Sequence, residues 1–244
     1  MSRFVLYTVS KDKQKGHPDM NQIRIWAKNT CTPRSVINWL LGMILCPLGV
    51  AFAAKSGFGV SMIEAPVYVL HLKLAEALPW FTFGTSEYFV QGVLLIALWI
   101  AVRQFRPRYL LSFVTAFLYG LVLDRWNEVL SYTPTAMPLR LVYAALGILI
   151  TALAVAFFFR TRMPQEVWEL FVKELSDEYR FDMTKTKWIY DISSLCAGIL
   201  LMLLFFRAVR WDAIGAGTIV TTLINAPIIG LFGKLIDRFE PEGK

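Results

Sequence analysis

The sequence carries little charge for its length. Asp, Glu, Lys and Arg make up 18% of the 244 residues, whereas hydrophobic residues make up 56%. A soluble globular domain has about 25% charged residues, so this chain lacks the polar surface that a soluble body of its size needs. The composition excludes a soluble cytosolic enzyme and predicts an integral membrane protein.

The residues that build metal centres and nucleophilic active sites are also scarce. The three cysteines, Cys31, Cys46 and Cys196, have no metal-ligand spacing and imply no disulfide framework. The two histidines, His17 and His71, lie far apart and form no zinc motif. We find no Ser/His/Asp or Cys/His set, no zinc-protease helix motif and no P-loop. We therefore expect no metal, no cofactor and no enzymatic activity.

Basic residues are in excess, and the formal net charge is +7. In a membrane protein the cytoplasmic flanks collect Lys and Arg, so the charge does not require a nucleic acid partner. Seven basic residues lie within residues 1–34. We expect this segment to be a cytoplasmic N-terminal extension that rests on the anionic membrane surface.

Six stretches are apolar enough, alone or with their flanks, to cross a bilayer core of about 30 Å. Tryptophans lie near several of their ends, where aromatic rings prefer the membrane interface. The sequence therefore predicts an all-α, polytopic membrane helix bundle. The six expected spans are Ser35–Ala54, Tyr88–Val102, Tyr109–Leu123, Leu141–Phe159, Ile192–Phe206 and Ala213–Gly233.

Two further stretches are expected to be helical without spanning. Pro164–Tyr179 has Val167, Leu170, Phe171 and Leu175 at helical spacing, which predicts an amphipathic surface helix that starts at Pro164. Ser61–Glu76 is more apolar, and the choice between a re-entrant and a surface-lying helix stays open.

The distribution of charge predicts the topology. With the N-terminus inside, the inner segments hold eighteen Lys and Arg and the outer segments hold five. Because basic residues accumulate on the cytoplasmic side, both termini are expected in the cytoplasm.

The chain also shows signs of an internal duplication. A shift of 105 residues aligns Gly42 with Gly147 and Glu64 with Glu169, and a shift of 113 aligns the Gly-x-x-x-Asp-Arg sequences that begin at Gly120 and Gly233. We expect a first membrane repeat at residues 35–126 and a second at 138–239. Each repeat has three spans, so the second is expected to be inverted in the membrane.

Three glycine-rich patterns stand out in the chain. They are Gly57-Phe-Gly-Val-Ser61 followed by Ala65-Pro66, Tyr109–Ala116 running to Gly120 and Asp124, and Gly215-Ala-Gly-Thr218 with Asn225-Ala-Pro227 and Gly230. Together these patterns resemble the YczE/YyaS/YitT family of bacterial integral membrane proteins. The resemblance covers about residues 35–239, and it implies the fold and a place in the bacterial inner membrane but no reaction and no substrate.

Inverted repeats are typical of secondary transporters, whose sites lie near the bilayer midplane between the repeats. Polar groups inside spans are costly and usually face protein or a water-filled cavity. The candidate substrate-binding residues are Glu64, Gln91, Asp191, Thr218 and Asn225.

Two glycine pairs precede helical stretches, where free N–H groups could bind an anion. The alternative is a tight turn or close helix packing, which small residues favour in membranes. These residues are Gly57, Gly59, Gly215 and Gly217.

These features predict a transporter of a small polar or charged solute, with its site between the two repeats. The alternative is a non-transporting membrane scaffold or accessory protein. The expected partners are the lipid bilayer and a small-molecule solute, a homo-oligomer stays open, and no nucleic acid is expected.

Overall fold

The computed structural model describes residues 31–103, 106 and 108–239, so the predicted basic segment 1–34 lies almost wholly outside the described residues. The described part is all-helical and contains no strand. Its helices are α2 (Pro33–Ser56), α3 (Ala65–Leu74), α4 (Phe83–Val102), α5 (Arg108–Val129), α6 (Met137–Phe158), α7 (Val167–Tyr179), α8 (Met183–Phe206) and α9 (Ala216–Phe239).

Five of these helices, α2, α4, α6, α8 and α9, are long and apolar enough to cross a membrane. The sixth expected span falls on α5, which does not reach that apolar content, because Asp124 and Arg125 lie in its last turns. The prediction of a helical membrane bundle is thus confirmed at this level.

Local sequence accounts for where several helices begin. The hydroxyls of Thr32 and Thr82 accept hydrogen bonds from the backbone N–H groups of Ser35 and Thr85, at 3.3 and 3.0 Å. The Asp182 carboxylate does the same for Lys185 at 2.9 Å. Such caps satisfy N–H groups that have no partner inside the helix. The starts of α2, α4 and α8 are therefore set by their own sequences.

Helices α2 and α6 pack closely and antiparallel at the centre of the fold, where small residues let their backbones meet. A Cβ atom on Gly49 would lie 2.9 Å from the carbonyl oxygen of Gly147. At one end, Arg140 donates to the carbonyls of Ser56 and Gly57. At the other end, Ser35 and Thr161 share hydrogen bonds.

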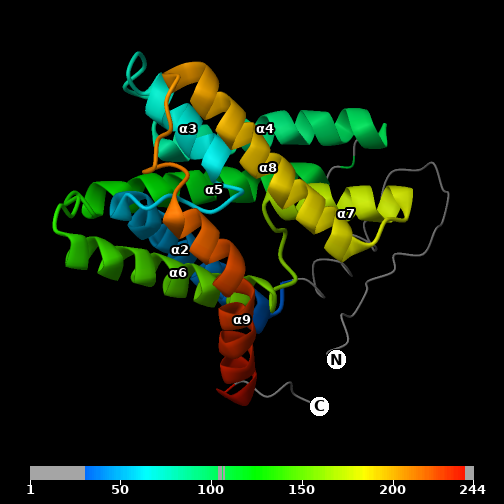
Figure 1. Cartoon of the computed structure of the whole chain (residues 1–244). Helices are drawn as coiled ribbons and strands as arrows, with labels where there is room; N and C mark the ends of the chain where they lie inside the picture. Colours follow the sequence, from blue (N-terminus) through cyan, green and yellow to red (C-terminus); the bar gives the residue numbers. More distant parts are fainter. Residues whose placement is uncertain (1–30, 104–105, 107, 240–244) are drawn as a thin grey trace.

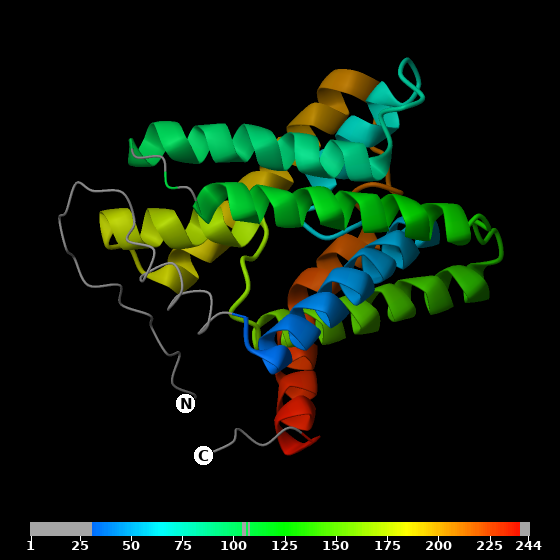
Figure 2. The same ribbon diagram turned by 180° about the vertical axis from the view of Figure 1, so that it is seen from behind.

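Helices α4 and α5 form an antiparallel hairpin beside this pair, whereas α8 and α9 diverge (Figures 1 and 2). In both views α9 runs across the direction of α4, α5 and α6. Helix α9 packs on α6, and α8 packs on α3.

The two short helices are more deeply placed than the sequence suggested. Val167 and Trp168, at the start of α7, are 0% and 5% exposed, and α7 packs on α4, α5 and α8. The prediction of a surface helix was therefore wrong for the first turns of α7. The helix also begins at Val167 rather than at Pro164, whose carbonyl accepts hydrogen bonds from Trp39 Nε1 and Thr115 Oγ1 instead.

The helix predicted over Ser61–Glu76 is shorter in the structure. Helix α3 covers Ala65–Leu74, and Glu64 precedes it as the N-cap residue. Ala65 and Val67 are fully buried, and Gly198 of α8 lies against Ala65. The start of α3, like the start of α7, is thus enclosed by protein.

Candidate functional site

The side chain of Gln91, near the middle of α4, joins two carboxyl groups and a helix start. Its Nε2 donates to Glu87 Oε1 at 2.9 Å and to Glu166 Oε2 at 2.7 Å. Its Oε1 accepts from the backbone N–H of Val167 at 2.8 Å, in the first turn of α7. Gln91 and Glu87 are fully buried and Glu166 is 9% exposed. Gln91 therefore attaches the start of α7 to α4.

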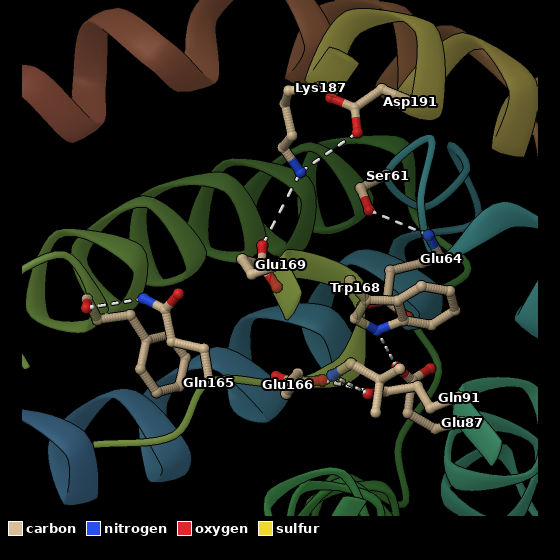
Figure 3. A network of polar contacts seen from close by, with 12 residues as sticks. Ser61, Glu64, Glu87, Gln91, Gln165, Glu166, Trp168, Glu169, Lys187 and Asp191 are labelled. Carbon is tan, nitrogen blue, oxygen red and sulfur yellow. Dashed lines mark hydrogen bonds and ion pairs between the residues drawn. The ribbon is translucent and has the colours of Figure 1, made fainter. Parts of the chain in front are cut away.

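Trp168 and Glu64 complete this group (Figure 3). The indole Nε1 of Trp168 donates to Glu87 Oε1 at 2.9 Å. Glu64, the N-cap residue of α3, is 8% exposed and lies beside Trp168 and Glu87. We call Glu64, Glu87, Gln91, Glu166 and Trp168 the carboxyl network.

The carboxyl network is acidic, and no basic side chain in the described part of the chain pairs with it. Every ion pair described in the structure joins other residues, so no basic side chain among the described residues compensates Glu64, Glu87 or Glu166. One oxygen each of Glu64 and Glu87, the Oε2 atoms, has no hydrogen-bond partner among the described residues. Buried charges of this kind are costly unless they are paired or neutralised.

Burial raises the pKa of Glu64 and Glu166 well above the usual range of a glutamate, and the neighbouring Glu87 carboxyl raises both pKa values further. The helix dipoles act in the opposite direction, because both residues precede helix N-termini, which favour negative charge. Neither carboxylate bonds to a free N–H of its own helix. The network can therefore hold protons or bind a cation.

A groove of about 500 Å³ lies beside the network, between α3, α4, α7 and α8. Its walls are apolar and aromatic, and they include Trp168, Phe171 and Tyr190. The Tyr190 ring lies 6.4 Å from the Trp168 ring and 5.6 Å from the Phe171 ring, centre to centre. This volume is in the range of small-molecule sites.

The sequence-predicted residues fall in separate places. Glu64 and Gln91 come together in the carboxyl network. Asp191 instead forms an ion pair with Lys187 at 3.2 Å, and Lys187 also lies 3.8 Å from Glu169 of α7 (Figure 3). Asp191 is thus beside the network but has a cationic partner.

Thr218 belongs to a different contact, where the two glycine pairs meet. The N–H of Gly217 donates to the Phe58 carbonyl at 2.8 Å, and Thr218 Oγ1 donates to the Val60 carbonyl at 2.7 Å. A Cβ on Gly59 would lie 2.5 Å from the backbone nitrogen of Gly215. These contacts match the alternative of close helix packing rather than an anion site, because protein groups occupy the positions that an anion would take.

Gly57 and Asn225 complete the set. Gly57 ends α2 with a φ of 68°, a left-handed conformation that glycine adopts at little cost. Asn225 lies in α9, seven residues after Thr218, and its Oδ1 is buried with no hydrogen-bond partner among the described residues. Neither residue joins the carboxyl network.

Sequence reasoning missed Glu87, Glu166 and Trp168. Two signals were present. Glu87 and Gln91 are four residues apart, which places them on one face of a helix. Glu166 precedes its short helix as Glu64 precedes the other, a match that appears at a shift of 102 residues rather than 105. In the described part of the chain no group of three His, Cys, Asp or Glu side chains has the arrangement of a metal site.

The fold and the buried network define a multi-pass helical membrane protein. Residues 33–234 match a family of unknown function, DUF6198, and the chain belongs to this family. It is 25% identical over 203 residues to the uncharacterized protein YyaS of Bacillus subtilis, a match that covers 81% of this chain and 92% of the relative. The predicted resemblance to YyaS-type proteins is confirmed. No solved structure matches the chain.

Proposed function

We propose that this protein moves a small polar or charged solute across the bacterial inner membrane, through a site between two inverted repeats. The proposal includes no enzymatic reaction. The observation that carries it is the carboxyl network, three buried glutamates without a cationic partner among the described residues, beside a groove of about 500 Å³. Ionisable groups inside membrane proteins usually mark ion or solute pathways, because their burial is otherwise unfavourable.

The contacts between helix ends support six spans, with α5 as the sixth. The ends form two separate sets, and α5 runs from one to the other, antiparallel to α4. One set joins Ser35 to Thr161, Arg106 to Glu174, Ala101 to Tyr179, and Arg160 to Asp237. The other joins Arg140 to Ser56, Asp124 to Thr82, Phe58 to Gly217, and Val60 to Ala213.

These two sets match the sides that the charge distribution predicts. The first set contains the segments expected in the cytoplasm, and the second contains those expected outside. We therefore propose that both termini are cytoplasmic. In a variant without native cysteines, a cysteine at Glu128 should react with an impermeant thiol reagent from outside the cell, and one at Asp177 should react only after the membrane is opened. The reverse pattern would contradict the proposed topology.

The helix contacts also support an inverted repeat. The order span, short helix, span, span occurs twice, as α2–α5 and α6–α9. Helix α3 of the first group packs on α8 of the second, and the equivalent helix α7 of the second group packs on α4 of the first. Gly42 lies against Phe158, and Gly147 lies against Ala53. The shift of 105 residues aligns Gly42 with Gly147 and Ala53 with Phe158, so the two contacts are equivalent. A two-fold relation would produce such exchanged contacts.

Each short helix would then be re-entrant. Helices α3 and α7 begin at the buried network, and their last turns approach opposite sets of helix ends, with Lys73 near the Phe206 ring and Tyr179 bonded to Ala101. Interrupted helices whose N-termini meet at mid-depth are typical of secondary transporter sites. This arrangement favours transport over the alternative of a membrane scaffold, whose centre would be apolar and fully packed.

Water access to the groove tests transport against the scaffold alternative. Ser194 lines the groove, and a cysteine there, in a variant without native cysteines, should react with a charged thiol reagent in membranes that are open on both sides. A cysteine at Ala154, which is fully buried in α6, is the control and should stay unreacted. If both positions resist the reagent, the groove is closed to water and the transport proposal fails.

A further inference from the structure

We propose that the groove between α3, α4, α7 and α8 binds an organic cation, which exchanges with protons held by Glu64, Glu87 and Glu166. This inference rests on the proposed transport function and adds to it the class of the solute and its coupling ion. It concerns a lipophilic, positively charged molecule rather than a hydrated metal ion, because the groove walls are apolar and aromatic.

The first support is the sign of the uncompensated charge. Glu64 and Glu87 each keep one buried carboxyl oxygen without a hydrogen-bond partner among the described residues. The hydrogen bonds that Glu87 accepts from Gln91 and Trp168 come from neutral side chains. A carboxylate in such surroundings attracts a cation strongly, because the effective dielectric constant is low. An anionic solute would be repelled by the same group.

The second support is the way the groove connects to the acids. Trp168 lines the groove with its ring and holds Glu87 through its indole N–H. Two more groove residues are close in the chain to the acids, since Pro66 follows Glu64 by two residues and Val90 follows Glu87 by three. The acids do not themselves line the groove, so a cation against the Trp168 ring would be separated from Glu87 by that side chain and would not displace the helices that carry the acids.

The third support is the aromatic lining. Tryptophan and tyrosine faces attract cations, and the attraction grows when water is excluded. Trp168, Tyr190 and Phe171 form a continuous set of rings along the groove. This lining suits a cation that carries its own apolar surface, because the groove itself offers few polar groups.

Protons are the natural competitors for this site. The pKa of Glu64 and of Glu166 is raised by burial, so protons bind these groups near neutral pH more readily than they bind exposed glutamates. When the cation binds, a proton leaves the network for water; when a proton returns, the cation is released. The titratable groups that face the network from the surrounding helices are Cys46, Tyr119, Glu169, Lys187, Tyr190 and Asp191.

The test uses the purified full-length protein in detergent and tetraphenylphosphonium as the probe. Tetraphenylborate, which has the same shape and the opposite charge, is the matched control ligand. We expect saturable tetraphenylphosphonium binding at pH 8.5, at least about tenfold weaker binding at pH 5.5, because a competing proton weakens binding up to tenfold per pH unit, and no comparable binding of tetraphenylborate. Absence of tetraphenylphosphonium binding, equal binding of both ions, or binding that does not change with pH would overturn the inference.

A variant pair then locates the site. Glu87→Gln keeps the shape of the side chain and an oxygen for Trp168 and removes the charge, so binding should fall at least about tenfold. Glu128→Gln removes a charge from an exposed side chain and should bind as the unmodified protein does. If Glu87→Gln elutes as a single folded species and still binds with the original affinity and pH dependence, the site is elsewhere. Should the variant not fold, the pH and tetraphenylborate comparisons on the unmodified protein still decide.

Uptake into liposomes separates this inference from the proposed function. A panel of radiolabelled cations, anions and zwitterions is offered to liposomes that contain the protein, with an imposed pH gradient. Uptake of cations alone, driven by the gradient, supports both proposals. Uptake of anions or zwitterions alone keeps the transport function and overturns the cation inference. Tetraphenylphosphonium binding without any uptake keeps the site and overturns transport.

Discussion

The α4–α5 and α8–α9 pairs hold equivalent places in the order of elements, yet they pack differently. In α4–α5 the backbones touch, because a Cβ on Gly120 would lie 2.5 Å from the carbonyl oxygen of Gly84. Asp124 closes the same end by accepting hydrogen bonds from Thr82 Oγ1 and the Gly84 N–H, at 2.6 and 2.8 Å. In the most apolar stretch of α4, 39% of the residues are buried, against 17% in α8 and 11% in α9.

The second pair uses its matching residues for other contacts. Asp237, which aligns with Asp124, binds Arg160 just after the end of α6, and Gly233, which aligns with Gly120, faces the same arginine. The same order of elements thus forms a closed hairpin in one half and two separately anchored helices in the other. The closed hairpin carries the more deeply buried acid, Glu87.

The largest expected effect comes from closing the space between α4 and α5. Gly84→Ala would place a methyl group against the Gly120 backbone, so the helices must separate, and we expect a loss of about 2–3 kcal/mol of stability. The matched control is Gly230→Ala in α9, where nothing lies within 4 Å and helix propensity favours alanine by up to about 1 kcal/mol. Thermal unfolding of both proteins in detergent measures the difference. Equal midpoints would contradict the contrast between the α4–α5 hairpin and the α8–α9 pair.

The second prediction compares the two N-cap glutamates by pH. Because the folded-state pKa of Glu64 and Glu166 is raised, the folded protein binds more protons than the unfolded chain, so stability falls as pH rises above about 4.3. A carboxyl pKa that is higher by one in the folded protein lowers the stability at high pH by about 1.4 kcal/mol. Glu64→Gln should reduce this fall of stability with pH more than Glu166→Gln does. Only Glu166 receives a hydrogen bond from Gln91, and that bond partly offsets the rise of its pKa.

Unfolding midpoints between pH 5 and pH 9 measure this effect, and Glu128→Gln is the control with an exposed side chain. A midpoint that rises with pH in the unmodified protein would show that Glu64 and Glu166 are stabilised as anions. The helix dipoles would then outweigh burial.

The third prediction sets the two aligned aspartates against each other. Asp124→Asn weakens a charge-assisted cap at the start of α4, and we expect a loss of about 1–2 kcal/mol. Asp237→Asn weakens an ion pair whose aspartate is 59% exposed, so the loss should stay below about 1 kcal/mol and shrink further at high salt. Urea or thermal unfolding at two salt concentrations separates the two. A larger loss for Asp237→Asn would mean that α9 is held as tightly as α4.

The sequence sufficed for the features that depend on local pattern. The apolar stretches predicted the class of protein, and the two short helical stretches were found between the correct neighbours. Glu64 and Gln91 were both selected because each is polar within an apolar stretch. Their meeting with Glu87 and Glu166 could not be predicted, because it depends on α7 packing against α4, a contact between residues some 75 positions apart.

The prediction that α7 is a surface helix failed in its first turns for a physical reason. Its helical pattern shows a polar face, and such a face usually meets water or lipid headgroups. Here part of that face meets protein: Glu174 is 2% exposed and accepts hydrogen bonds from Arg106 and Tyr109. A periodic pattern describes one helix and says nothing about polar partners supplied by another.

The smallest expected effect concerns Asp191, the ninth residue of α8, as Gln91 is the ninth of α4. Gln91 joins two carboxyl groups and a backbone N–H, whereas Asp191 pairs with Lys187, whose side chain is 37% exposed. Pairs of this kind within a helix contribute about 0.3–0.5 kcal/mol, so Asp191→Asn should shift the unfolding midpoint little and leave tetraphenylphosphonium binding within about twofold. A strong loss of binding with normal folding would place Asp191 in the cation site. The two halves would then both supply acids to it, and their difference would lie in packing alone.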